Sequence, residues 1–177
     1  MAPGLLFRLS MRGLRRFTAF LAAALFALAG GIACNDNSDH GTTPTGGSLA
    51  QVELGGPSGT VTSGAAFNID VKARNLGFSV LHNVRVHVVL PPPLVADSVD
   101  TTAGGGTASI ANGANGATVD FAFGTIDKNS QSTGTIHAHG SLASGMNNVP
   151  LTVTAELTSD EVHAGDVEAS ITVTLQQ

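Results

Sequence analysis

Apolar and polar residues alternate with a period of two over most of the chain beyond residue 48. Between positions 67 and 74, the apolar side chains of Phe67, Ile69, Val71 and Ala73 are separated by polar or charged ones. The same alternation recurs in residues 50–54, 84–90, 119–123, 136–138, 151–157 and 167–175. A period of two is typical of a β-strand with one buried face, and no stripe with helical spacing competes with it. The pattern therefore predicts at least seven strands.

Clusters of Gly, Asn, Asp, Ser and Pro separate these segments. Pro91-Pro92-Pro93 directly follow residues 84–90, and proline ends a strand because it donates no hydrogen bond to a neighbouring strand. Residues 101–118 are Gly-rich but lack the lysine of a phosphate-binding loop, so we expect a long loop with at most a short strand near 108–110. Many half-apolar strands are usually buried between two antiparallel sheets. We therefore expect an all-β sandwich of about seven to eight strands in residues 48–177.

The first 33 residues have the pattern of an export signal. Residues 1–16 are basic and carry four arginines, whereas residues 17–33 are uncharged and mostly apolar. This order is typical of a secretory signal peptide. The apolar run is short for a helix that spans a bilayer, which needs about 20 apolar residues. We therefore predict a signal peptide that is cleaved, in preference to a permanent membrane span.

The segment Gly31-Ile32-Ala33-Cys34 resembles the lipobox of bacterial lipoproteins, in which small residues precede a cysteine that is diacylated and becomes the new N-terminus. The resemblance implies lipid attachment at Cys34. A lone cysteine can form no internal disulfide and would be a liability as a free thiol outside the cytoplasm. Residues 34–47 are polar and rich in Gly and Thr, which predicts a flexible tether. We expect an exported protein whose lipid anchors it to the bacterial cell envelope.

The charge of the chain limits its partners. Beyond Cys34 there are 4 basic and 13 acidic residues, which gives a net charge of −9, against −5 for the full chain. An acidic surface argues against electrostatic capture of nucleic acid or anionic lipid. We expect the membrane, through the N-terminal lipid, to be one partner, and other envelope proteins or surface polymers to be further candidates.

Several short motifs resemble the conserved-repeat domain of bacterial surface proteins, catalogued as domain of unknown function eleven. They are Asn75-Leu76-Gly77 after one predicted strand, Leu90-Pro91 at the end of the next, and Phe123-Gly124-Thr125-Ile126 before the segment 132–139. The resemblance covers roughly residues 61–175. It implies an immunoglobulin-like antiparallel β-sandwich and a role in display, adhesion or spacing, and it carries over no catalytic residue.

Three histidines form the candidate metal site. His137 and His139 are two residues apart, so both rings project from the same face of a strand, and His87 also faces outward on its strand. In an immunoglobulin-like strand order these two strands are neighbours in one sheet. The three imidazoles could then gather as a divalent-metal site of the zinc or copper type. The alternative is a solvated sheet face that binds nothing.

Other candidate sites have weaker support. The segment 158–166 has three carboxylates, the ligand type that calcium prefers, but its spacing matches no established calcium loop, so an ordinary polar connection is favoured. No nucleophile-elbow motif, His-rich helix or paired-cysteine site is present. We therefore predict no enzymatic activity and no cofactor.

Together these features predict a non-enzymatic cell-envelope lipoprotein. Its parts are a signal peptide (1–33), a tether (34–47) and an immunoglobulin-like sandwich (48–177) that serves adhesion, interaction or spacing. The alternative is an envelope lipoprotein that binds a metal or a small ligand through His87, His137 and His139.

Overall fold

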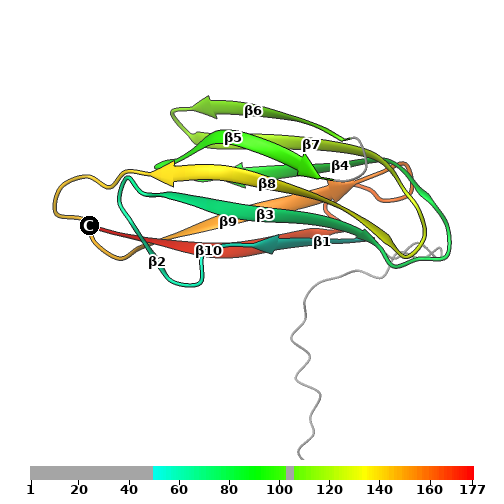
Figure 1. Ribbon diagram of the computed structural model, residues 1–177, viewed down its shortest axis with the longest axis horizontal. Helices are drawn as coiled ribbons and strands as arrows, with labels where there is room; N and C mark the ends of the chain where they lie inside the picture. Colours follow the sequence, from blue (N-terminus) through cyan, green and yellow to red (C-terminus); the bar gives the residue numbers. More distant parts are fainter. Residues whose placement is uncertain (1–49, 103–105) are drawn as a thin grey trace, which may run out of the picture. The chain divides into compact units, whose positions relative to one another are not determined.

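The computed structural model describes residues 50–102 and 106–177, and these residues form two β-sheets packed face to face (Figure 1). The predicted signal peptide, Cys34 and the predicted tether lie outside the described residues. The described ranges contain ten strands. They are β1 (Ala50–Gly55), β2 (Thr60–Thr62), β3 (Ala66–Asn75), β4 (Leu81–Leu90), β5 (Leu94–Thr102), β6 (Thr107–Gly113), β7 (Gly116–Ile126), β8 (Ser130–Gly140), β9 (Val149–Thr158) and β10 (Glu168–Gln176). In these ranges there is no helix of the length and apolar character needed to cross a membrane.

One sheet has four strands in the order β1-β3-β8-β5, and the other has six in the order β2-β10-β9-β4-β7-β6. Neighbouring strands are antiparallel except β2 and β10, which pair in parallel. The predicted all-β, immunoglobulin-like sandwich is confirmed. The described residues contain more strands than predicted, because β2 is only three residues long and β5 contains a bulge between Ala96 and Ser98 that interrupts its alternation. The prediction of a long loop at residues 101–118 is also wrong, since β6 occupies Thr107–Gly113 and β7 begins at Gly116.

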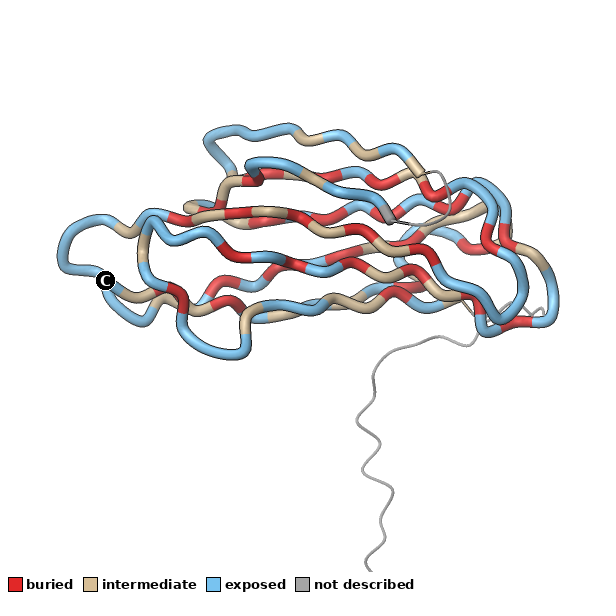
Figure 2. Tube along the Cα trace, in the orientation of Figure 1, coloured by how far each residue is buried: buried red, intermediate tan, exposed pale blue. Residues whose placement is uncertain are grey.

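The alternating apolar residues form one core between the sheets. Buried and exposed residues alternate along most strands, as Figure 2 shows. Burial of one large apolar side chain contributes about 1.5–3 kcal/mol, so the core dominates the stability of the fold. Phe121 and Phe123 of β7 stack with their ring centroids 5.4 Å apart. Gly134 of β8 lies against the Phe121 ring so closely that an added Cβ atom would overlap the ring.

A side chain joins the two sheets along one side of the sandwich. Asn112 of β6 accepts a hydrogen bond from the backbone N–H of Ala96 at 3.1 Å and donates one to its carbonyl oxygen at 2.8 Å. Ala96 lies on β5, which is an edge strand of the four-stranded sheet. Exposed edge strands tend to pair with other chains. The Asn112 amide therefore occupies backbone groups of β5 that a foreign strand could otherwise bind.

The loops gather at two opposite ends of the sandwich. Ala50, the first residue of β1, pairs with Asn75, the last residue of β3. The chain therefore comes into the sandwich at the end that carries the β3–β4 loop, which we call the proximal end. The C-terminal Gln177 lies at the other end, the distal end, where it hydrogen bonds with Ala143, Gly145 and Asn147 of the β8–β9 loop (Figure 1).

Candidate functional site

The three predicted metal-binding histidines do not share a surface. His137 and His139 lie on β8 in the four-stranded sheet, whereas His87 lies on β4 in the six-stranded sheet. The prediction that their strands are neighbours is therefore wrong. In this sandwich β8 pairs with β3 and β5, while β4 pairs with β7 and β9. All three rings point outward from their sheets, so His87 faces away from the other two across the core.

The two histidines of β8 are hydrogen bonded to neighbouring strands. The Nδ1 atom of His139 lies 2.9 Å from both carboxylate oxygens of Asp97. The Nε2 and Nδ1 atoms of His137 lie 2.9 Å from Asp100 and 2.8 Å from Asn68. Both nitrogens of His137 are thus already engaged. In the part of the chain that the structure describes, no group of three His, Cys, Asp or Glu side chains is placed to hold a metal ion.

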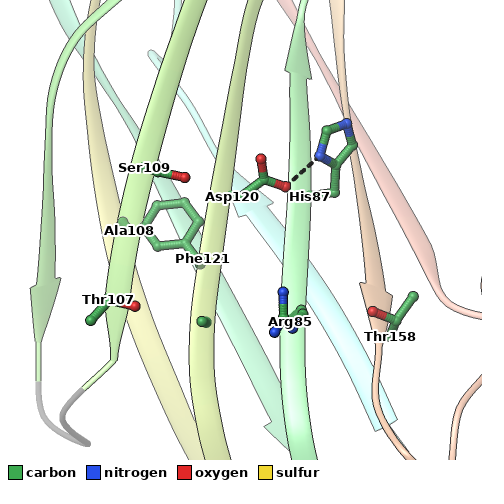
Figure 3. A pocket seen from close by; sticks show the side chains of 9 residues that line it. Arg85, His87, Thr107, Ala108, Ser109, Asp120, Phe121 and Thr158 are labelled. Atoms are coloured by element: carbon green, nitrogen blue, oxygen red, sulfur yellow. Dashed lines mark hydrogen bonds and ion pairs between the residues drawn. The ribbon is translucent and has the colours of Figure 1, made fainter.

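The outer face of the six-stranded sheet instead carries an open hollow of about 380 Å³ (Figure 3). Two cross-strand rows of residues run from β9 through β4 and β7 to β6. The first row is Thr158, Arg85, Ala122 and Thr107, and the second is Glu156, His87, Asp120 and Ser109. The hollow lies over these rows because Ala122 is small and stands between the longer side chains of the first row. We call this site the Arg85 hollow.

Arg85 gives the hollow its most distinctive chemistry. Its guanidinium forms no hydrogen bond or ion pair with any other described residue, and the hydroxyl-bearing side chains of Thr107, Ser109 and Thr158 line the same hollow. Guanidinium groups bind carboxylate or phosphate groups through two parallel hydrogen bonds. Arg85 could therefore hold an anionic group of a partner, beside the Asp120 carboxylate that lines the same hollow. The sequence alone does not reveal the hollow, because the hollow depends on the register of four strands, although the alternation does place Arg85 and His87 on the same outward face.

His87 and Asp120 form a close pair in the hollow, with 2.6 Å between Nδ1 and Oδ1 (Figure 3). Ser109 also lines the hollow, so the three residue types of a Ser-His-Asp triad occur together here. In a triad the imidazole lies between the hydroxyl and the carboxylate, because it moves the proton of the hydroxyl. Here the cross-strand row is Ser109, Asp120, His87, so the carboxylate lies between the other two. This order does not let His87 activate Ser109.

The carboxylates of the β9–β10 loop form hydrogen bonds with the first residues of β4. Glu161 accepts hydrogen bonds from the His82 backbone N–H at 3.0 Å and from the Ser159 hydroxyl at 2.9 Å, and it lies 2.8 Å from the His82 ring. Asp160 accepts a hydrogen bond from the Asn83 side chain at 2.7 Å. Partial burial acts to raise the pKa of Glu161, but the hydrogen bonds from His82 and Ser159 outweigh it and hold the pKa below its ordinary value. The Asp160 and Glu161 carboxylates thus hold the β9–β10 loop against β4, which fits the ordinary polar connection expected for residues 158–166.

We expect Glu161→Gln to lower the free energy of unfolding by about 1 kcal/mol at pH 7. The pKa of Glu161 is lower in the folded state, so its ionised form stabilises the fold above the ordinary glutamate pKa. That contribution is lost as the pH falls through the lowered pKa. Urea unfolding at pH 7 and pH 3.5 should therefore show a gap between wild type and variant that shrinks in acid. Asp127→Asn, in the exposed β7–β8 loop, is the control with no gap at either pH, because the Asp127 side chain forms no hydrogen bond or ion pair with any described residue. A gap of equal size at both pH values for Glu161→Gln would contradict this role of Glu161.

Comparisons with known proteins identify the fold and no family. No family model matches the chain, and no curated protein does. Among solved structures, the cohesin module of a family 33 glycoside hydrolase from Clostridium perfringens is similar over 73% of this chain and 98% of its own, with 11% identity and a TM-score of 0.53. A CARDB domain from Pyrococcus furiosus matches over 72% of this chain and 93% of its own (14% identity, TM-score 0.47). A non-cellulosomal cohesin from Archaeoglobus fulgidus matches over 72% and 92% (12% identity, TM-score 0.47).

Proposed function

We propose that this chain is an exported lipoprotein, anchored to the cell envelope through Cys34, whose immunoglobulin-like sandwich is a non-enzymatic module for adhesion, interaction or spacing. The first 34 residues support the export and the anchor, because a basic segment and an apolar segment precede a lipobox-like cysteine. An acyl chain contributes about 0.8 kcal/mol per buried CH₂ group, so several chains on one N-terminus would hold the protein stably on a bilayer.

The location of the ionisable side chains supports a non-enzymatic role. Among the described residues, the only buried polar side chains are those of Asn75 and Ser132. Every described Asp, Glu, His, Lys and Arg lies on an outer sheet face or in a loop. Catalytic groups usually sit in clefts where partial desolvation tunes their pKa values. An open sheet face is better suited to contact with another surface.

The Arg85 hollow is the surface we propose for such contact. It is open and polar, and its guanidinium has no partner among the described residues. The use of a similar sandwich as a cohesin module within a larger Clostridium perfringens enzyme is consistent with a modular role. Lys72 and Arg74 are paired with Glu53, so Arg85 is the cation that the sheet faces offer to an anionic group of a partner.

Fatty-acid labelling tests the anchor. We expect the wild-type chain, produced in a bacterial host that processes lipoproteins, to incorporate an alkyne-labelled fatty acid, and Cys34→Ser to incorporate none, because Cys34 is the only cysteine. Equal labelling of both chains, or of neither, would contradict lipid attachment at Cys34. Turnover of a panel of glycoside, peptide and ester substrates by the purified mature protein would contradict the non-enzymatic role.

A further inference from the structure

Phe78, at the tip of the β3–β4 loop, has the most exposed large hydrophobic side chain among the described residues. Its exposed fraction is 87%, and that of its neighbour Leu76 is 41%. A single exposed apolar residue is common and needs no partner. Two further observations distinguish Phe78: the loop is held in one conformation, and it lies where the chain comes into the sandwich.

The buried side chain of Asn75 holds the loop. Its amide nitrogen donates hydrogen bonds to the carbonyl oxygens of Ser79 at 2.7 Å and Ile126 at 3.0 Å, and its Oδ1 accepts one from the Gly77 N–H at 3.0 Å. The Asn75 side chain therefore fixes the backbone directly before Phe78, at Gly77, and directly after it, at Ser79. The ring is therefore presented outward by an ordered loop, so little conformational entropy remains to be lost on binding.

The position of the Phe78 loop in the sandwich places it on the side nearest to a membrane that holds the lipid of Cys34. Ala50 pairs with Asn75, so the segment that leads to Cys34 joins the sandwich beside the Phe78 loop. Residues 35–49 make fifteen residues between Cys34 and Ala50. A flexible polar chain of this length spans about 20 Å on average. This span is shorter than a ten-residue strand such as β3, which is about 33 Å long. A lipid on Cys34 would therefore keep the proximal end nearer to the bilayer than the distal end.

The charges of the proximal end favour contact with a bilayer of neutral lipids over one of anionic lipids. Its described loops carry four carboxylates and a single lysine, Lys128. The carboxylates are those of Asp127, Asp160, Glu161 and Asp166. An acidic end is repelled by anionic lipid headgroups, so electrostatic attraction is not available. Contact with a neutral bilayer must then come from apolar side chains.

We propose that Phe78, supported by Leu76, inserts into the interfacial region of a neutral lipid bilayer and orients the anchored sandwich with its distal end outward. This inference rests on the proposed lipid anchor at Cys34. It adds a second, weaker membrane contact, which would restrict rotation of the domain on its tether and present the Arg85 hollow along the side of the sandwich.

Single-tryptophan variants test this proposal, because the chain contains no Trp and no Tyr. Phe78→Trp places a reporter at the proximal loop. Met146→Trp places a matched reporter at the distal end, where the Met146 side chain is 48% exposed. Each mature protein is purified from the membrane fraction of a bacterial host that processes lipoproteins and is mixed with phosphatidylcholine vesicles that have brominated acyl chains. We expect the Phe78→Trp emission to be quenched several-fold more strongly than that of Met146→Trp. Equal unfolding midpoints for both variants and wild type would show that the fold is kept.

Flotation of the vesicles separates the two ways in which the idea can fail. If the proteins float with the vesicles but both tryptophans are equally quenched, or neither is, the anchor stands and insertion of Phe78 is wrong. If the proteins do not float and mass spectrometry finds no acyl group on Cys34, both the anchor and the insertion are wrong. Strong quenching of Phe78→Trp alone, in proteins that float, supports both.

Discussion

Asn75→Ala should lower the free energy of unfolding by about 3 kcal/mol, because it leaves three backbone groups without their partner. The Asn75 side chain is completely buried, and it bonds the Gly77 N–H and the carbonyl oxygens of Ser79 and Ile126. A buried polar group that loses its hydrogen bond keeps the full penalty of desolvation. For a domain of this size the midpoint of thermal unfolding should fall by about 10 °C. Urea and thermal unfolding followed by circular dichroism measure both quantities.

Asn68→Ala is the matched control on the same strand. Asn68 is exposed and hydrogen bonds only to the His137 ring among the contacts described, at 2.8 Å. Its removal exposes no buried group, so the loss should stay below about 1 kcal/mol. Similar losses for the two variants would show that the β3–β4 loop does not depend on Asn75.

Gly134→Ala should destabilise the sandwich by about 2 kcal/mol through overpacking of the core. The added Cβ atom would overlap the ring of Phe121, which is only 1% exposed and stacks on Phe123. Phe121→Leu removes the overlapping atoms, so the double variant should be more stable than the sum of the two single losses predicts. A coupling energy of about 1 kcal/mol or more in urea unfolding would fit this account.

Gly59→Ala is the control for the change from glycine to alanine itself. A Cβ atom at Gly59 has no other atom within 4 Å, so the substitution should have little effect. If Gly134→Ala is as neutral as Gly59→Ala, or if its loss is simply additive with that of Phe121→Leu, then β7 and β8 do not pack as closely as described.

The alternation of apolar residues predicts most strands and their buried faces, since a side chain's face in a strand depends only on local sequence. It does not predict β5, because the bulge near Asp97 shifts the alternation between Ala96 and Val99. It also could not place His87 relative to His137. Which strands pair depends on long-range packing between the sheets, and a period of two carries no information about that order.

The same distinction applies to the candidate sites. The Arg85 hollow requires Ala122 of β7 to stand beside Arg85 of β4, which is a matter of strand register. The role of Asn75, in contrast, has a signal in the local sequence. Positions 67, 69, 71 and 73 are apolar and face inward, and Asn75 occupies the next inward position. A polar residue at such a position indicates a buried side chain that must find hydrogen bonds.

The most direct test of the central claim is the mass of the N-terminal peptide of the mature protein purified from a bacterial membrane fraction. The account predicts that the peptide begins at Cys34 and carries a diacylglyceryl group on its sulfur atom. A peptide that lies upstream of Cys34, or an unmodified Cys34 in a protein with an intact sandwich, would contradict the claim that this domain is displayed on a lipid anchor.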